Sequence, residues 1–305
     1  MIFASLRTGF RQMWANKRLV LIFFLANFAF GLLLTLPLRS ALDRFIGGSL
    51  MGAELGGRFN FDFLFEFMKN NPGLMEAYPI LLLVTFATYW LVTLFLSGGA
   101  FAVFAHEEGY ASTRFWGGAG RYFGRFFRLA LWSLPLLALF VGASFIVKLF
   151  QRLLFGSDPY EYVTYWANWI VVALRTLAIL LFGLVFDYAR IYLVLTDETR
   201  SRAALWRGLG LVFRNLLPTF GLGFLFFFLG VVALVLYNPL ADALAAPNAL
   251  VLLLLFLLQQ GYMLWRMMLR LALYAGELSL YRSLAEAATV PAAPAADLGL
   301  EGTPA

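Results

Sequence analysis

Six long apolar segments constrain the fold of this chain more than any other feature of its sequence. Each is near or above the roughly 20 residues that an α-helix needs to cross the hydrocarbon core of a bilayer. They cover residues 19–38, 78–104, 129–150, 163–195, 216–237 and 249–274. The chain is 62% hydrophobic and 13% charged, whereas a soluble domain is roughly 45–50% apolar and 25% charged. We therefore expect lipid to cover most of its surface.

The continuity of these segments decides between the two folds that can span a bilayer. Backbone groups in lipid need partners within the protein, which leaves helices and closed barrels. Barrel strands would alternate apolar and polar side chains over about ten residues, and these segments do not. The sequence predicts an all-α polytopic membrane bundle of six transmembrane helices, formed by a single domain over residues 1–284. The Ala- and Pro-rich residues 285–305 are expected to form a disordered tail.

Lysine and arginine are distributed unequally over the two sides of this bundle. Sixteen lie in the N-terminal arm, in the connections after the second and fourth segments, and in the last segment with its tail, against six in the other connections. Because such an excess marks the cytoplasmic side, both termini are predicted to be cytoplasmic. The first segment is longer than the roughly 7–15 apolar residues of a cleavable signal peptide, so we expect it to remain as a span.

Arginine-striped stretches precede the first, third and fifth apolar segments. Arginines share one face of each predicted helix, and apolar side chains occupy the other faces. A helix of this kind lies in the membrane interface with its arginines among lipid phosphates. Two interpretations remain open. The arginines either only fix the orientation of the protein in the membrane, or they also form a docking surface for anionic lipid or a protein partner. The candidate contacts are Arg114, Arg121, Arg125, Arg128, Arg200, Arg207 and Arg214.

The segments group into three units, each with an amphipathic stretch, an outgoing span, an external turn and a returning span. Their approximate limits are residues 1–106, 107–198 and 199–282. A short pattern in the first amphipathic stretch, Leu6-x-x-Gly9-x4-Trp14-x-Asn16, recurs as Leu205-x-x-Gly208-x4-Phe213-x-Asn215 and more faintly as Phe115-Trp116-x-Gly118-x4-Phe123. A true threefold repeat and chance similarity both remain open, because glycine and aromatic residues are common in this chain.

Residues 60–69, in the first external connection, fit two structures. Their phenylalanines alternate as in a strand, but a single strand would have no obvious partner. A helix capped by Asn60, with Phe61, Leu64, Phe65 and Met68 on one face, suits the membrane interface. We expect the helix.

Arg175 is the basic residue that lies well inside an apolar segment, on the order of 10–13 Å deep at 1.5 Å per residue. Ionisable groups at such depth are candidates for functional sites. Gln259, Gln260 and Tyr89 lie at similar depth, and Asn27 lies near the middle of the first span. If these residues face one another, they form a site for an anionic ligand. The alternative is that Arg175 extends toward the interface and the amides join helices.

Asp187 and Arg190 lie where the fourth span ends on the basic side. Asp187 can pair with Arg190, or with Arg266 and Arg270 at like depth on the sixth span, or it can carry a proton. Charge neutralisation is the commoner role at this position.

Few groups are present that could perform catalysis or bind a metal. The chain has no cysteine, which excludes disulfides and thiolate chemistry, and its single histidine is His106. We therefore expect a non-enzymatic protein with no catalytic residues, no metal and no cofactor. The net charge is +6, and most of the lysines and arginines that give rise to it lie on one side of the membrane. Lipids and not nucleic acid are therefore the expected partners.

Three motifs resemble those of a known group of proteins. They are Ser97-Gly98-Gly99-Ala100, the aromatic and arginine-rich residues 120–128, and Asp187-Tyr188-Ala189-Arg190. Together they resemble uncharacterised bacterial six-helix integral membrane proteins. More distantly, they are similar to the membrane-anchor domain of glycerophosphodiester phosphodiesterases. The resemblance covers most of residues 1–282 and implies the bacterial cytoplasmic (inner) membrane. The catalytic barrel of the fused enzymes is absent from this sequence, so no catalytic residue is implied.

These observations favour a membrane-embedded scaffold or lipid-interacting subunit over an enzyme. Its expected partners are membrane lipids, anionic on the cytoplasmic side, together with a possible membrane protein or a second copy of the chain. The alternative is a permease or lipid translocase for an anionic substrate, with Arg175, Gln259 and Gln260 as its midplane site.

Overall fold

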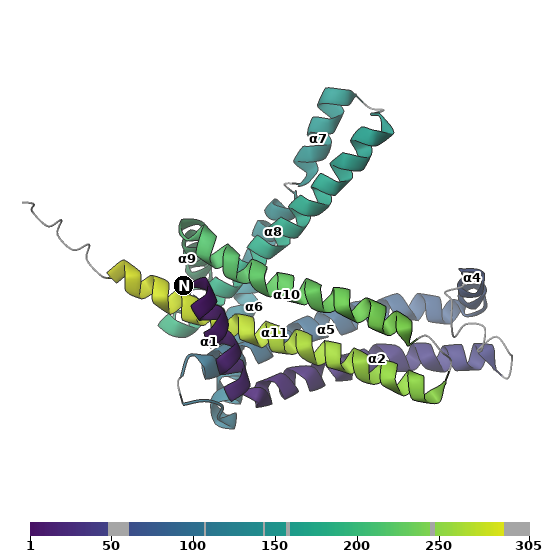
Figure 1. The fold of residues 1–305 in the computed structure, drawn as a ribbon, viewed down its shortest axis with the longest axis horizontal. Coiled ribbons are helices and arrows are strands. Elements are labelled where there is room, and N and C mark those ends of the chain that lie inside the picture. The colour runs from purple at the N-terminus through teal and green to yellow at the C-terminus, as the bar shows by residue number, and fades with distance from the viewer. Residues whose placement is uncertain (48–60, 107, 143, 157–158, 245–247, 290–305) are drawn as a thin grey trace, which may run out of the picture.

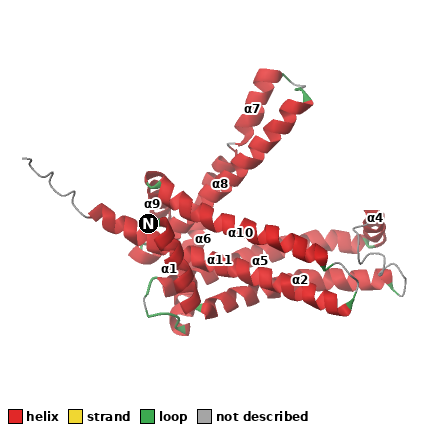
Figure 2. Ribbon diagram, in the orientation of Figure 1, coloured by secondary structure: helices red, strands yellow, loops and turns green. Residues whose placement is uncertain are grey.

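Helices form almost all of the structure, which is a computed structural model that describes residues 1–47, 61–106, 108–142, 144–156, 159–244 and 248–289 (Figures 1 and 2). Within these residues, six helical stretches are long and apolar enough to cross a membrane. The prediction of an all-α, multi-pass membrane protein is therefore confirmed. The helices are α1 (Ile2–Ala15), α2 (Lys17–Ile46), α4 (Phe61–Asn70), α5 (Pro72–Phe104), α6 (Ser112–Gly142), α7 (Ser144–Phe155), α8 (Glu161–Thr196), α9 (Ser201–Arg214), α10 (Leu216–Ala243) and α11 (Ala249–Thr289).

The membrane-spanning helices are longer than the apolar segments from which they were predicted. Five segments each lie within one helix, and the third runs from the end of α6 into α7. Large apolar side chains such as Leu83, Leu153 and Leu217 are exposed on their outer faces. Apolar surface of this extent is typical of a face covered by lipid. α11 continues to Thr289, into the segment expected to be a disordered tail, and residues 290–305 lie outside the described part of the chain.

Asparagine separates two of the amphipathic helices from the spans that follow them. The C-cap residue after α1 is Asn16 and the one after α9 is Asn215, with φ of −115° and −123° and ψ of 40° and 44°. Each side-chain amide donates to the carbonyl four residues earlier, at 2.8 and 3.2 Å. Such side chains compete with the hydrogen bonds of the helix, so the chain turns there. α6 has Arg125 at the corresponding position and continues from its amphipathic half into its span.

A glycine in each amphipathic helix packs against the returning helix of the preceding unit. A Cβ added at any of the three glycines would collide with its neighbour, so only glycine allows this close approach. The contacts are Gly9 with Ala272 and Gly276 on α11, Gly118 with Ala102 on α5, and Gly208 with Val185 and Ala189 on α8. Among the described helices, these are also the pairs with the most extensive contacts. Because α1 packs on the last helix, the three contacts close a ring, and the recurring sequence pattern corresponds to a recurring contact.

The buried core lies at the arginine-rich end of the molecule. Its largest fully buried side chains include Phe101, Phe115, Phe126, Tyr188 and Tyr274. They belong to the last turns of α5 and α8, to α11 and to the first half of α6. Away from this core, α7 and the first half of α8 extend in a direction different from that of α2, α5, α10 and α11 (Figure 1). The amphipathic helices and the helix ends on which they pack therefore form the best-packed part of the protein.

The helix predicted in the first external connection is confirmed as α4. Phe63 and Phe67 are buried against α2, where both rings contact Phe45 at centroid distances of 5.7 and 5.4 Å. Phe61 and Phe65 are exposed on another face, as expected for a helix at a membrane interface. The predicted cap, Asn60, lies outside the described residues.

Candidate functional site

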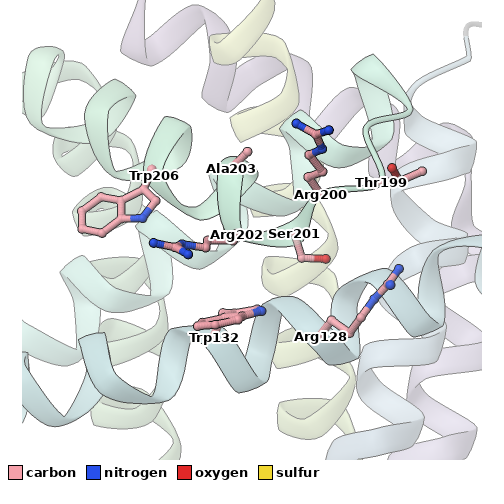
Figure 3. Close-up of a pocket in the computed structure, with 8 residues that line it drawn as sticks. All are labelled: Arg128, Trp132, Thr199, Arg200, Ser201, Arg202, Ala203 and Trp206. Carbon is pink, nitrogen blue, oxygen red and sulfur yellow. The ribbon is translucent and has the colours of Figure 1, made fainter.

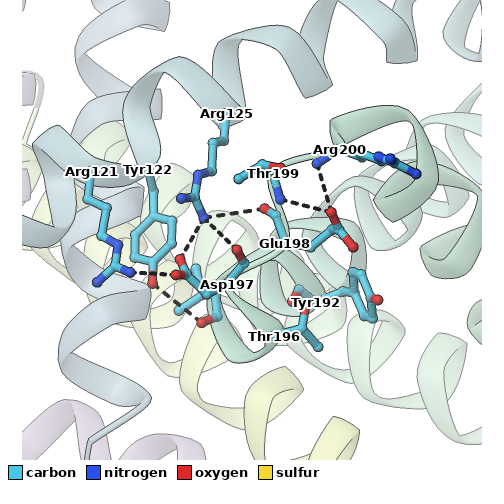
Figure 4. Close-up of polar contacts among 10 residues, drawn as sticks. Arg121, Tyr122, Arg125, Tyr192, Thr196, Asp197, Glu198, Thr199 and Arg200 are labelled. Atoms are coloured by element: carbon cyan, nitrogen blue, oxygen red, sulfur yellow. Dashed lines mark hydrogen bonds and ion pairs between the residues drawn. The ribbon is translucent and has the colours of Figure 1, made fainter.

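Ion pairs neutralise three of the seven arginines that were predicted to contact lipid or a partner. Arg114 pairs with Glu108. Arg121 and Arg125, one turn apart on α6, both pair with Asp197, at 2.5 and 2.7 Å (Figure 4). These three side chains therefore already have an acidic partner within the protein.

Asp197 follows the last residue of α8 in a left-handed conformation, with φ of 53° and ψ of 24°. Aspartate is among the few residues that adopt this conformation readily. The turn places its carboxylate between Arg121 and Arg125. The hydrogen bond from Arg125, with the bond from Arg121 and both positive charges, holds the pKa of Asp197 below its ordinary value. The short connection between α8 and α9 is thus clamped onto α6.

Two further contacts fix the start of α9. The Glu198 carboxylate accepts hydrogen bonds from the backbone N–H groups of Thr199 and Arg200, at 3.0 and 3.1 Å (Figure 4). The hydroxyl of Ser201, which is buried, donates to the backbone carbonyl of Arg125 at 3.0 Å. The first turn of α9 is therefore held at a defined position beside α6.

A basic pocket of about 640 Å³ lies at this junction (Figure 3). Arg128 on α6 and Arg200 and Arg202 on α9 line it, and no acidic residue does. Within the described chain, none of these three arginines forms an ion pair. Arg202 extends between the indoles of Trp206 and Trp132 and lies 5.7 Å from the ring centroid of Trp132. We name this the basic pocket, and its remaining lining residues are Thr199, Ser201 and Ala203.

The N-terminus of α9 adds to the positive character of the basic pocket. The helix begins at Ser201, and its N-cap residue, Arg200, makes no capping hydrogen bond through its side chain. The first N–H groups of a helix have no partner within the helix, and its dipole favours an anion at this end. Helix N-termini of this kind bind phosphate groups. Three arginines and the first residues of a helix therefore line one pocket, and the Glu198 carboxylate accepts hydrogen bonds from the two N–H groups just before that helix.

An apolar groove of about 400 Å³ continues from the basic pocket between α6 and α9. Trp132, Arg202 and Trp206 line both spaces. The rest of the groove is lined by Pro135, Leu136, Leu139, Leu205 and Leu209. The combined site is amphipathic, with cationic groups at one end and hydrocarbon at the other.

Sequence reasoning identified Arg128 and Arg200 in this site but missed Arg202, Trp132 and Trp206. A signal was present, because the spacing Arg-x-x-x-Trp places an arginine and an indole on one helix face and occurs at both 128–132 and 202–206. The other two predicted arginines lie elsewhere. Arg207 donates to the hydroxyl of Tyr192 and lies over its ring, and Arg214 is exposed at the end of α9.

The residues predicted to form a midplane site are not gathered around Arg175. Arg175 is exposed on the half of α8 that runs beside α7, and its Nε donates to the hydroxyl of Ser144 on α7 at 3.1 Å. Gln259 and Gln260 lie on α11 and Asn27 on α2, in the part of the molecule from which this half of α8 diverges (Figure 1). Tyr89 of α5 packs on Phe30 of α2, with ring centroids 5.4 Å apart.

The arginine that is most deeply buried in the described chain is Arg190. It pairs with Asp187, which was one of the predicted alternatives, and only 4% of its surface is exposed. Its guanidinium lies 4.7–5.8 Å from the ring centroids of Phe101, Phe126, Phe186 and Tyr274. This pair lies inside the core and lines neither the basic pocket nor the apolar groove.

Comparison of the chain with protein-family models, with curated proteins and with solved structures found no match.

Replacing Asp197 with asparagine should loosen the connection between α8 and α9. Asparagine also tolerates the left-handed backbone, so the substitution removes the charge without straining the turn. Backbone amides of residues 197–203 are expected to exchange with deuterium faster in the variant, as measured by mass spectrometry.

The pH dependence of the same experiment provides its control. A carboxylate with a lowered pKa stabilises the fold above its unfolded pKa of about 3.9, and this contribution is lost as the pH falls through the lower folded value. Protection of the turn should therefore decrease in acid more in the native protein than in the variant, which keeps only the Glu198 carboxylate in this segment. Equal acid sensitivity in both would contradict the role given to Asp197.

Proposed function

We propose that this protein is a non-enzymatic membrane protein that binds an anionic phospholipid at its arginine-rich end. The observation that carries the proposal is the joined pair of spaces between α6 and α9. The basic pocket offers guanidinium groups and a helix N-terminus to a phosphate, and the apolar groove beside it offers hydrocarbon to an acyl chain.

The apolar groove favours a lipid over a soluble anion. A soluble anion would use the basic pocket and leave the adjoining apolar surface exposed. Trp132 and Trp206 also suit this position, because indole rings are enriched at the level of lipid headgroups. The lysine and arginine bias supports a cytoplasmic position for this end and for both termini, and the resemblance to bacterial six-helix membrane proteins supports an inner membrane. The clamp formed by Arg121, Arg125 and Asp197 would keep the two helices at the separation that the lipid requires.

Binding of anionic lipid should weaken at least tenfold when Arg128 and Arg202 are both replaced by glutamine. Each charge-assisted hydrogen bond contributes about 1.5–3 kcal/mol, and 1.4 kcal/mol corresponds to a tenfold change in affinity. The measurement is native mass spectrometry of the purified protein titrated with phosphatidylglycerol, with phosphatidylcholine as the zwitterionic comparison.

The matched control is the pair Arg39→Gln and Arg44→Gln on α2, at the opposite end of the molecule. It makes the same change in net charge outside the site, so its lipid affinity should stay near that of the native protein. The proposal fails if the control loses as much affinity as the test variant, or if phosphatidylcholine binds as tightly as phosphatidylglycerol.

A further inference from the structure

The basic pocket is larger than one phosphate group requires. Its volume of about 640 Å³ equals that of about 20 waters in the liquid, at ~30 Å³ each, which is several times the size of a phosphate. Arg128, Arg200 and Arg202 line it, and the described residues that share this lining include no acid. The pocket therefore has both the room and the positive charge for more than a single phosphate.

Arg128 and Arg202 lie at different ends of this pocket. The Nε of Arg128 donates to the backbone carbonyl of Gly124, one turn earlier on α6, at 3.3 Å. The guanidinium of Arg202 lies 5.7 Å from the ring centroid of Trp132, one turn later than Arg128 on α6. Figure 3 shows the two guanidinium groups pointing away from each other, with Ser201 between them. One phosphate therefore contacts one of these two arginines but not both.

The side chains that line the pocket besides its arginines and indoles are small and uncharged. They belong to Thr199, Ser201 and Ala203. The hydroxyl of Ser201 is already used in the hydrogen bond to the backbone carbonyl of Arg125. A lining of this kind suits an uncharged polar bridge, such as glycerol, between two phosphates.

In the part of the chain that the structure describes, space for hydrocarbon adjoins one end of the basic pocket. Arg202 lines both the basic pocket and the apolar groove, whereas Arg128 lines the basic pocket alone. An acyl chain in the groove therefore places the phosphate of its lipid at Arg202. A second phosphate at Arg128 has no groove beside it for a chain of its own, so the same molecule best supplies it.

We infer that the ligand is a phospholipid with two phosphate groups joined by a short polar bridge, which is the chemistry of cardiolipin. This inference rests on the proposed function and adds to it the class of headgroup. The first phosphate contacts Arg202 beside the groove, and the second contacts Arg128. Two binding groups on one molecule gain affinity because the second contact is intramolecular. Basic pockets between helices on the cytoplasmic side of a membrane bind headgroups of this kind.

The test titrates the full-length protein in detergent with cardiolipin and with phosphatidylglycerol of the same acyl chains, followed by native mass spectrometry. Phosphatidylcholine is the zwitterionic reference. Cardiolipin is expected to bind at least tenfold more tightly than phosphatidylglycerol, because its second phosphate gains a partner. Arg128→Gln should weaken cardiolipin binding at least tenfold, whereas phosphatidylglycerol, which Arg202 holds beside the groove, should bind as before.

Arg44→Gln on α2 is the matched control. Arg44 is exposed, and its Nε donates to the backbone carbonyl of Ser40, four residues earlier, at 3.1 Å, which is the same kind of contact that Arg128 makes. The variant loses the same charge at the opposite end of the molecule, so it should keep the native preference for cardiolipin. A preference that came only from the additional charge and chains of cardiolipin would persist in Arg128→Gln. Gel filtration shows whether each variant is folded.

The outcomes separate this inference from the proposed function. If phosphatidylglycerol binds better than phosphatidylcholine but cardiolipin binds no more tightly, or keeps its advantage in Arg128→Gln, the headgroup with two phosphates is wrong and anionic lipid binding stands. If neither anionic lipid binds more tightly than phosphatidylcholine, the proposed function fails and this inference fails with it. Deacylated cardiolipin, which has both phosphates but no acyl chains, should compete weakly; competition as strong as that of cardiolipin would assign a soluble bisphosphate and overturn the lipid.

Discussion

Replacing Arg190 with methionine is expected to destabilise the protein by about 3–5 kcal/mol, the usual result of removing one partner from a buried ion pair. The substitution leaves the Asp187 carboxylate buried beside Glu277 with no cation in contact. It also removes the guanidinium from the aromatic faces that surround it. Unfolding in mixed detergent micelles, followed by tryptophan fluorescence, measures the change.

A double variant separates the ion pair from general damage to the core. Asp187→Asn together with Arg190→Met removes both charges, and replacing both partners of a buried pair is often close to neutral. We expect the double variant to recover most of the stability that the single variant loses. If the two variants are equally unstable, the packing of the long side chain and not its charge is what matters at Arg190.

Alanine at Gly208 and alanine at Gly210 should change stability in opposite directions. A Cβ at Gly208 would lie 2.9 Å from the backbone carbonyl oxygen of Val185 and from the backbone nitrogen of Ala189. These atoms belong to α8 and cannot move alone, so the crowding should cost about 1–3 kcal/mol. A Cβ at Gly210, on the same helix, meets no atom within 4 Å. There the better helix propensity of alanine should stabilise by up to about 1 kcal/mol.

The same comparison tests whether the ring contact is shared among the units. Gly118 and Gly120 on α6 form the corresponding pair, one packed against Ala102 and the other free. Thermal unfolding of the four single variants is the measurement. Similar signs at Gly118 and Gly120 would show that the contact with α5 does not resemble the contact between α9 and α8.

The spans were predictable because the signal for each lies within one continuous stretch of chain. Apolar length identifies a membrane helix without any knowledge of its neighbours. α4 was predictable for a related reason, since its length and the spacing of its apolar side chains favoured a helix. The ring of three glycine contacts was less predictable. A glycine in the sequence indicates that another helix can approach closely, but it does not identify which helix does so. Gly9 meets a helix at the other end of the sequence.

The candidate site was likewise predictable from the sequence only in part. Helical spacing found the arginine faces, but it could not show that Asp197 neutralises Arg121 and Arg125, because this depends on a left-handed turn after α8. The expected site around Arg175 rested on equal depth in the membrane. Depth gives the height of a residue but not its direction around the bundle, and Arg175 lies on a hairpin that points away.

The order in which the helices are made determines when each contact of the ring can form. α6 can dock on α5 and α9 on α8 as soon as each leaves the ribosome, because the receiving helix has just been made. α1 precedes α11 in the sequence, yet the surface on which α1 packs belongs to α11. Until α11 has been made, the Gly9 face of α1 therefore lacks the helix on which it packs. The contact between α1 and α11 then closes the ring.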